Sequence, residues 1–242
     1  MELAPTNGLI EKLRLTKDVG EVARIELAAS IADAALAELW PRMAGGVTER
    51  EFGLDLDMAM RRLGADDVSF ETIIASGPNG AKPHARPSGR VIGDGDLVVV
   101  DFGALVDGYH SDMTRTAAVG SISDTQQRML DVVGAAQAAG VDAITPGVEG
   151  REVDAACRAT IEDAGWGDAF LHSTGHGVGL DIHEDPRVAS TTETALSPGQ
   201  VVTVEPGVYL ADHGGVRIED TMLVTAHGAR HLTHAPKDPA VA

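Results

Sequence analysis

Several features that mark other protein classes are scarce or absent in this chain. Cys157 is the only cysteine among its 242 residues, so no intrachain disulfide can form, and its helix-like surroundings predict that it packs in the core. No stretch approaches the roughly 18 consecutive apolar residues that a membrane-spanning helix needs. The amino terminus also lacks a basic segment followed by an apolar one, which argues against a signal peptide. The sequence therefore predicts a cytoplasmic protein.

Positive charge is scarce as well. Lysine and arginine number 19 against 37 aspartate and glutamate residues, for a formal net charge of −18 at pH 7. Nucleic acids and anionic membranes attract basic surfaces, so this balance argues against both as the main partner. Hydrophobic residues nevertheless make up 43% of the chain, enough for the core of one large domain or two modest ones.

Two common enzyme signatures are missing. The chain contains no Gly-x-Ser-x-Gly sequence, so nothing indicates a serine nucleophile. The sequence GHGVG at 175–179 resembles a phosphate-binding loop, but it lacks the Gly-x-Gly-x-x-Gly spacing and the lysine of a P-loop. We interpret its glycines instead as allowing the backbone and a substrate to approach His176 closely.

The spacing of apolar residues and the capping signals predict alternating helices and strands. The segments at 48–63 and 123–140 each open with a capping box, a hydroxyl residue followed three positions later by Glu or Gln. Helices are expected at 16–40, 48–63, 123–140 and 150–164. Strands are expected at 71–75, 97–103, 109–119, 178–182, 201–205 and 216–224.

This order of elements repeats along the chain. The matching sequences are GVTEREF at 46–52 with GVEGREV at 147–153, HARP at 84–87 with HEDP at 183–186, and VVVDFG at 98–103 with VTVEPG at 202–207. The matches keep the same order at nearly constant separation, which indicates two homologous halves, about 16–120 and 121–230. They align Asp101 with Glu205, and Asp112 then falls opposite Glu219.

These four aligned residues are carboxylates at the ends of strand-like runs. Carboxylates that converge in a low-dielectric interior would repel each other by several kcal/mol unless cations lay between them. His176, which has no counterpart in the first half, adds one imidazole. Such a ligand set suits a pair of divalent ions, Mn(II), Co(II) or Fe(II), with Zn(II) also allowed. The sequence thus predicts a metal-dependent hydrolase.

The histidines of the two His-x-x-Pro sequences, His84 and His183, would remain free of the metal. Two ions about 3.5–4 Å apart can share bridging carboxylates and a bridging water, whose pKa they lower. The free histidines could then stabilise an oxyanion or protonate a leaving nitrogen. For Arg217 two interpretations stay open at this point, an exposed arginine in a salt bridge and a contact to the substrate.

The assembled motifs resemble the metallopeptidases of the pita-bread fold, which include methionine aminopeptidases, Xaa-Pro aminopeptidases and prolidases. The resemblance covers about residues 16–226 and rests on VVVDFGALVDGYHSDMTRT, STGHGVGLDIHEDP, TVEPGVY and GGVRIEDTMLV. It implies an α+β fold, in which two pseudo-symmetric helix–helix–strand halves surround a curved, mainly antiparallel sheet. The expected parts are an N-terminal arm or linker at 1–15, a catalytic domain at 16–230 and a C-terminal tail at 231–242.

The resemblance also implies a role for each metal ligand. Asp101 would chelate one ion, Asp112 and Glu219 would bridge two ions, and His176 and Glu205 would complete the second site. Two divalent ions per chain are implied, with Mn(II) as the first expectation.

Further residues receive catalytic and substrate-binding roles from the same resemblance. Glu205 would act as general base, His183 would stabilise the tetrahedral intermediate, and His84 would contact the substrate near the leaving nitrogen. His172 and Arg217 resemble the substrate-binding pair of the proline-directed branch. The implied partners are peptides with proline at the second position.

The implied enzyme is therefore an Xaa-Pro aminopeptidase. The alternatives are an Xaa-Pro dipeptidase (prolidase), a methionine aminopeptidase and a non-catalytic pita-bread binding module. Proline-directed members normally carry a further N-terminal domain, whereas only about 15 residues precede the first expected helix here. That domain usually contributes to dimerisation, so the resemblance allows a homodimer without requiring one.

Overall fold

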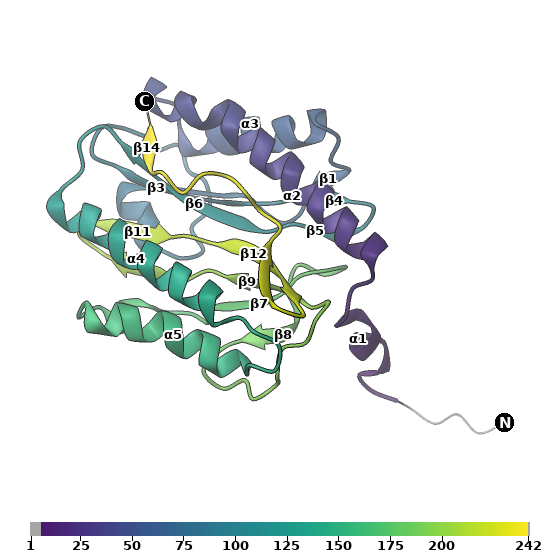
Figure 1. The fold of residues 1–242 in the computed structure, drawn as a ribbon. Helices are drawn as coiled ribbons and strands as arrows, with labels where there is room; N and C mark the ends of the chain where they lie inside the picture. Colours follow the sequence, from purple (N-terminus) through teal and green to yellow (C-terminus); the bar gives the residue numbers. More distant parts are fainter. Residues whose placement is uncertain (1–5, 242) are drawn as a thin grey trace.

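The fold contains two pairs of long helices, one pair from each half of the chain, together with the strands described below (Figure 1). The structure is a computed structural model and describes residues 6–241. The helices are α1 (Leu9–Arg14), α2 (Val19–Leu39), α3 (Glu49–Arg62), α4 (Asp124–Ala143) and α5 (Gly150–Asp163), with 3-10 turns η1 (Trp40–Gly45), η2 (Gly77–Ala81) and η3 (Gly167–Ala169). In Figure 1 the α2–α3 pair lies above the α4–α5 pair. The four long helices were predicted, and each is present.

Local capping explains where these helices begin. Thr48 and Ser123 form the predicted capping boxes of α3 and α4. Helix α2 begins later than predicted, because the side chain of Asp18 accepts a hydrogen bond from the backbone N–H of Glu21 and caps the helix there.

The strands form two main sheets, one built mainly by the first half with β14 of the tail at its edge and one built by the second half, and two smaller ones. One main sheet has the order β14-β6-β3-β2 and the other the order β13-β12-β9-β7-β8, and all pairs are antiparallel except β14 with β6. The strands are β1 (Asp67–Val68), β2 (Ile73–Ser76), β3 (Leu97–Phe102), β4 (Ala104–Val106), β5 (Tyr109–His110), β6 (Met113–Val119), β7 (Gly175–Gly177), β8 (Glu184–Val188), β9 (Val201–Val204), β10 (Gly207–Leu210), β11 (Gly214–Arg217), β12 (Asp220–Thr225), β13 (Gly228–His231) and β14 (Ala240–Val241).

Matched contacts in the two halves confirm the internal repeat. Thr48 forms an isolated β-bridge with Val91, and Glu149, its counterpart in the repeat, forms one with Ala195. The largest apolar cluster is built mainly by α2, α3, β3 and β6, and the second by α4, α5, β9 and β12. Each half therefore packs most of its own core, as a duplicated unit should.

Two predicted strands are interrupted at functionally placed residues. The expected strand at 109–119 is divided into β5 and β6, with Asp112 in the break, and the expected strand at 216–224 is divided into β11 and β12, with Glu219 in the break. The breaks occur because the two parts pair with different strands: β5 with β4 but β6 with β3, and β11 with β10 but β12 with β9. The two breaks occupy equivalent places in the two halves.

The strand predicted at 178–182 is wrong. Strand β7 ends at Gly177, and the chain then turns, with the N–H of Gly179 donating to the carbonyl of Asp181, before β8 begins at Glu184. The glycines of this region allow the turn, since a side chain at Gly179 would collide with the carboxylate of Glu184.

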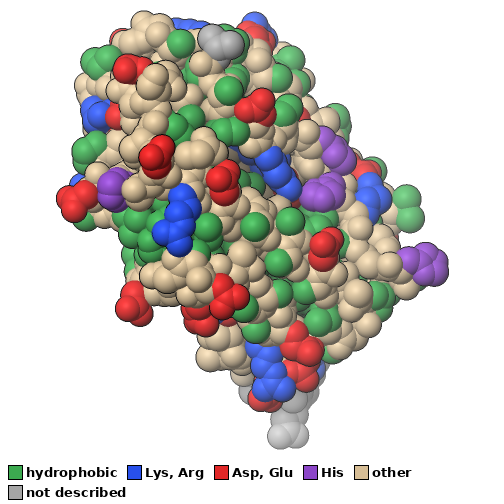
Figure 2. Space-filling model, turned by 60° about the vertical axis from the view of Figure 1, so that its left-hand side comes forward, with side chains coloured by type: hydrophobic (Ala, Val, Ile, Leu, Met, Phe, Trp, Pro, Cys, Tyr) green, Lys and Arg blue, Asp and Glu red, His purple; other side chains and the backbone are tan. Residues whose placement is uncertain are grey.

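The chain ends carry ordered structure within the described residues. Helix α1 lies inside the predicted arm, and β14 lies inside the predicted tail, where Thr233 and Ala235 are also buried. The domain boundaries drawn from the sequence stay a prediction. No helix among residues 6–241 has the length and apolar character needed to cross a membrane. On the face drawn in Figure 2, acidic side chains are spread among basic and apolar ones rather than gathered in one patch.

Candidate metal centre and active site

The five predicted ligands line a single cavity. It has a volume of about 270 Å³, and its walls also include all four of the other predicted site residues, His84, His172, His183 and Arg217. Both halves of the chain contribute to it: β3 supplies Asp101, β7 supplies His176, and Glu205 follows β9 directly. The geometry therefore brings together every residue that was singled out, while their individual roles stay predictions.

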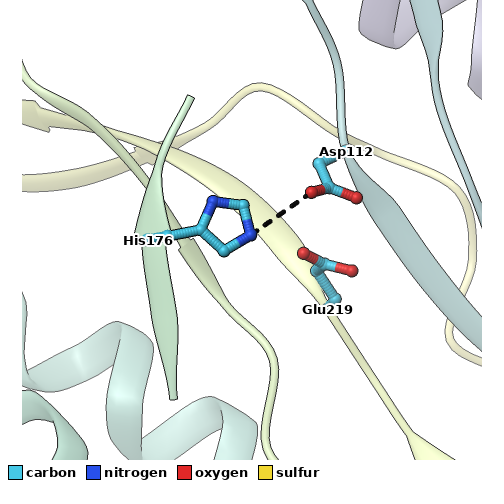
Figure 3. Close-up of side chains that lie close together, drawn as sticks. All are labelled: Asp112, His176 and Glu219. Atoms are coloured by element: carbon cyan, nitrogen blue, oxygen red, sulfur yellow. Dashed lines mark ion pairs between the residues drawn. The ribbon is translucent and has the colours of Figure 1, made fainter. Parts of the chain in front are cut away.

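Asp112, His176 and Glu219 form the tightest group in this cavity. Each offers a ligand atom, and the three atoms lie within 4.8 Å of one another. Figure 3 shows the three side chains pointing toward a common centre from three different segments. Nε2 of His176 lies 3.5 Å from Oδ2 of Asp112 and 3.3 Å from Oε1 of Glu205. This spacing would allow one cation to contact several of these atoms.

Unpartnered oxygen atoms support the interpretation as a metal site. Oδ1 of Asp101 and Oε1 of Glu219 are buried and have no hydrogen-bond donor among the described residues. Buried polar atoms normally find a partner, because an unpartnered one loses its hydration without compensation. Cations between the carboxylates would be such partners, so the residues present fit a centre for divalent ions.

The pKa values of the carboxylates show that burying these negative charges close together is unfavourable. Burial, and then the charges of Glu219 and other nearby carboxylates, raise the pKa of Asp112 well above its usual range. The pKa of Glu219 is raised well above its usual range for the same two reasons. Bound cations would favour the ionised forms and reverse these shifts.

Glu205 behaves differently from its neighbours. Burial raises its pKa, but the hydrogen bond and the charge of His176 outweigh burial and lower the pKa to about 2. Its side chain is 17% exposed and reaches the cavity. Glu205 is therefore ionised at neutral pH.

Threonines on the strands hold the ligands in place. The hydroxyl of Thr114 donates to Oε2 of Glu219 at 2.6 Å. The hydroxyl of Thr203 donates to Oε1 of Glu205 and accepts from the backbone N–H of His176. These bonds restrict the carboxylate rotamers before any ion binds.

Arg217 is buried, and the interpretation as an exposed salt-bridge arginine is wrong. It is 3% exposed, and its Nη2 donates to Oδ2 of Asp101 at 2.5 Å. Its Nη1 donates to the hydroxyl of Tyr209 at 2.8 Å, and Nε2 of His172 lies 2.8 Å from the same hydroxyl. A hydrogen-bonded chain therefore joins Asp101 to His172 through Arg217 and Tyr209.

The other histidines differ in their surroundings. The rings of His183 and His176 meet edge to face, with centroids 4.3 Å apart. Burial, followed by the charge of His176, lowers the pKa of His183, and burial also lowers the pKa of His172. Both are therefore neutral at pH 7. His231 is half-buried, and its Nδ1 lies 3.4 Å from Oδ2 of Asp220.

Sequence reasoning missed two residues of the site. Tyr209 was not among the predicted site residues, yet it connects Arg217 and His172, which both line the cavity. Arg187 lines the cavity beside His183, and within residues 6–241 its guanidinium makes no ion pair or side-chain hydrogen bond. No sequence signal beyond its position just after HEDP pointed to Arg187.

Two similar halves that enclose four carboxylates and an imidazole define a metallopeptidase of the pita-bread fold. Residues 23–226 match the family model described as Metallopeptidase family M24. The chain belongs to this family, whose members depend on two metal ions.

Comparison with individual proteins agrees with this assignment. The chain is 47% identical to the uncharacterized peptidase YqhT of Bacillus subtilis, covering 98% of this chain and 67% of that protein. It is 44% identical to a protein named Xaa-Pro dipeptidase in Pyrococcus furiosus, covering 98% of this chain and 68% of the relative. The chain thus spans about two thirds of the length of these relatives.

Solved structures show the same architecture. An Xaa-Pro dipeptidase from Bacillus anthracis superposes with a TM-score of 0.94 at 47% identity, over 98% of this chain and 67% of that one. An X-Pro aminopeptidase from Thermotoga maritima MSB8 gives a TM-score of 0.94 at 36% identity, over 96% and 66%. The pita-bread fold expected from the motifs is confirmed.

Proposed function

We propose that this protein is a dinuclear Xaa-Pro dipeptidase, an enzyme that hydrolyses the bond before the proline of a dipeptide. The observation that carries the proposal is Arg187, an exposed cation on the cavity wall with no acidic partner among residues 6–241. The proline of an Xaa-Pro dipeptide ends in a free carboxylate. The guanidinium of Arg187 can bind this carboxylate through two hydrogen bonds. The names of the Pyrococcus furiosus and Bacillus anthracis relatives support this choice over the aminopeptidase suggested by the sequence.

The cavity wall also suits the ring of proline. Apolar side chains line the same cavity as Arg187, namely Phe70, Ile73, Pro83 and Ile182. A pyrrolidine ring can bury its methylene groups against them while its carboxylate meets the guanidinium.

The proposed metal ligands are Asp101, Asp112, His176, Glu205 and Glu219. Oxygen-rich sites with one imidazole suit Mn(II), with Co(II), Fe(II) or Zn(II) as the other candidates. When bound, the ions supply a water of lowered pKa and a Lewis acid for the substrate carbonyl.

The protein's own groups then move and stabilise charge. Glu205, ionised at neutral pH, accepts the proton of the attacking water. His183, which is neutral, donates a hydrogen bond to the oxyanion. His84 contacts the departing nitrogen, while His172 and Arg217, connected through Tyr209, orient the substrate.

Kinetics on a short substrate panel test the proposal. The purified protein, first treated with chelator and then supplied with Mn(II), should hydrolyse Xaa-Pro dipeptides and should be inactive with chelator alone. Arg187→Met should raise KM for Xaa-Pro but leave the dipeptide amide, which has no terminal carboxylate, unaffected. Arg151→Met, which changes an exposed arginine in α5, is the matched control.

An Xaa-Pro aminopeptidase is the second candidate, because the Thermotoga maritima structure of that name superposes equally well. Faster cleavage of Xaa-Pro-Yaa peptides than of Xaa-Pro would establish it instead. Cleavage of Met-Ala-Ser peptides without a need for proline would indicate a methionine aminopeptidase. No turnover with any divalent metal would exclude all three.

A further inference from the structure

A buried ion pair joins the segment before α2 to the turn between β7 and β8. Nζ of Lys17 donates to Oε1 of Glu184 at 2.6 Å, and Nη2 of Arg14 donates to Oε2 at 2.6 Å. The Lys17 side chain is only 2% exposed and that of Glu184 only 10%. Arg14 also pairs with Asp181 in the same turn. In Figure 1 this segment runs from α1 to α2 beside the loops that follow β7.

The carboxylate of Glu184 lies at the centre of that turn. Oε2 accepts a long hydrogen bond of 3.4 Å from the backbone N–H of Asp181. A Cβ atom at Gly179 would lie 2.5 Å from Oε1, so the start of the turn packs directly against the same carboxylate. The carbonyl of Gly179 accepts in turn from the N–H of His110. The turn therefore contacts the carboxylate of Glu184 at both Gly179 and Asp181.

His183 is the residue just before Glu184. Its ring meets that of His176, but among residues 6–241 no side-chain hydrogen bond or ion pair holds it. The backbone of the turn sets the position of His183 and the direction of its Cα–Cβ bond, and the ring then packs against His176. A displacement of the backbone at Glu184 would therefore displace the imidazole of His183 in the cavity.

The segment that holds Glu184 is itself anchored to the turn before β9. The backbone N–H of Lys17 donates to the carbonyl of Gly199 at 2.8 Å, and a Cβ at Gly199, where φ is +89°, would lie 2.7 Å from Cγ2 of Thr16. Gly199 lies two residues before β9, and Glu205 follows the other end of that strand. Lys17 thus connects the turn that carries His183 to the turn before β9.

We infer that Lys17 and Glu184, assisted by Arg14, are positioning residues that hold His183 in its working orientation. The inference rests on the proposed function, in which His183 stabilises the oxyanion. Removing Lys17 leaves Oε1 of Glu184 buried without its donor while Arg14 still holds Oε2, so the turn would shift to hydrate the freed oxygen. A shift of about 1 Å at a catalytic group can reduce the rate about 100-fold.

Kinetics of Lys17→Met test the inference, with Lys17→Arg as the conservative variant. Lys17→Met should lower kcat by roughly 10- to 100-fold at unchanged KM and unchanged metal content, and Lys17→Arg should restore most of the rate. Lys12→Met, which changes an exposed lysine in α1, is the matched control. In a His183→Ala background, Lys17→Met should have no further effect on kcat. An equal loss in that background would overturn the inference, because Lys17 would then act by another route.

Amide hydrogen exchange gives a readout that does not need turnover. Lys17→Met and Glu184→Gln should speed exchange at residues 179–184 and leave α4 and α5 unchanged. Unchanged exchange at 179–184 would overturn the inference even if the enzyme were inactive on Xaa-Pro substrates. If wild type lacks activity while exchange responds as expected, the proposed function fails and the anchoring of the turn stands. Should Lys17→Met fail to fold, Arg14→Met carries the same test, since the Arg14 side chain is 26% exposed.

Discussion

Arg217 and Asp101 form a buried ion pair that leaves half of the aspartate free. Nη2 of Arg217 donates to Oδ2 of Asp101, whereas Oδ1 has no donor among residues 6–241. Oδ2 is thereby held by the guanidinium of Arg217, and Oδ1 remains available to a bound metal ion. Burial raises the pKa of Asp101 above its usual value, and the charge of Arg217 opposes this increase without cancelling it.

Arg217→Lys should therefore impair the enzyme although it keeps the charge. An ammonium cannot reproduce the fork that reaches Asp101 and Tyr209 together, so one buried group would lose its partner. A loss of about 1–3 kcal/mol corresponds to a decrease of roughly 5- to 150-fold in kcat/KM. Steady-state kinetics with Mn(II) measure it, and Arg230→Lys, at an exposed site, is the control. Full activity in Arg217→Lys would contradict a role for the fork.

Asp112→Asn should stabilise the metal-free protein while it abolishes activity. The carboxylate of Asp112 is buried among Glu219, Asp101 and Glu205, and without cations these charges repel it. Each 1 kcal/mol of repulsion removed would raise Tm by about 2–4 °C in a chain of this size. Thermal unfolding in chelator should show the increase, and Mn(II) should stabilise wild type but not the variant. A lower Tm for the variant in chelator would show that repulsion does not dominate there.

Glu49 should make the fold sensitive to acid. This buried side chain at the start of α3 accepts hydrogen bonds from Ser76, Asn79 and Ser88, at both ends of the segment that carries His84. Burial raises its pKa, but these hydrogen bonds outweigh burial and lower it below the usual value. The stabilisation is therefore present above the unfolded-state pKa of about 4.3 and is lost as pH falls through the lower folded-state value.

Glu49→Gln should consequently be less stable than wild type at pH 7, with the difference shrinking as pH is lowered toward 3. Chemical denaturation at several pH values measures this, with Glu11→Gln at an exposed site as the control. A difference that stays constant with pH would mean that the charge of Glu49 contributes nothing.

Cys157 should be unreactive in the folded protein. It is fully buried, and burial raises the pKa of its thiol to about 12. The reactive thiolate is therefore almost absent at pH 8. A chromogenic disulfide reagent should label Cys157 in denaturant and leave it unlabelled in buffer over the same time. Rapid labelling of the native protein would show that the core around α5 opens readily.

The structural features that could be predicted from the sequence are those that depend on local signals or on the internal repeat. Helices α3 and α4 follow from capping boxes at Thr48 and Ser123, because a cap is formed by residues three positions apart. The repeat aligned Asp101 with Glu205 and Asp112 with Glu219, and all four carboxylates line the same cavity.

The remaining features depend on partners that are distant in the sequence. The breaks at Asp112 and Glu219 arise because successive strand segments pair with different strands. Lys17 is a charged residue in an N-terminal segment, and only the folded chain reveals its burial against Glu184. Arg187 lies in β8, a strand that the sequence did not predict, and only the folded chain shows that its guanidinium lines the cavity without an ion-pair partner among residues 6–241.

The division of the apolar core between the two halves has a consequence for cooperativity. Asp101 and Asp112 belong to the half whose core is built on α2 and α3, whereas His176, Glu205 and Glu219 belong to the other. Ions bound by all five residues would act as a non-covalent cross-link between two folding units. Such a link resists separation of the units rather than the melting of either one. Loss of metal would then remove one link between the halves, beside direct links such as the buried ion pair of Arg115 with Asp220.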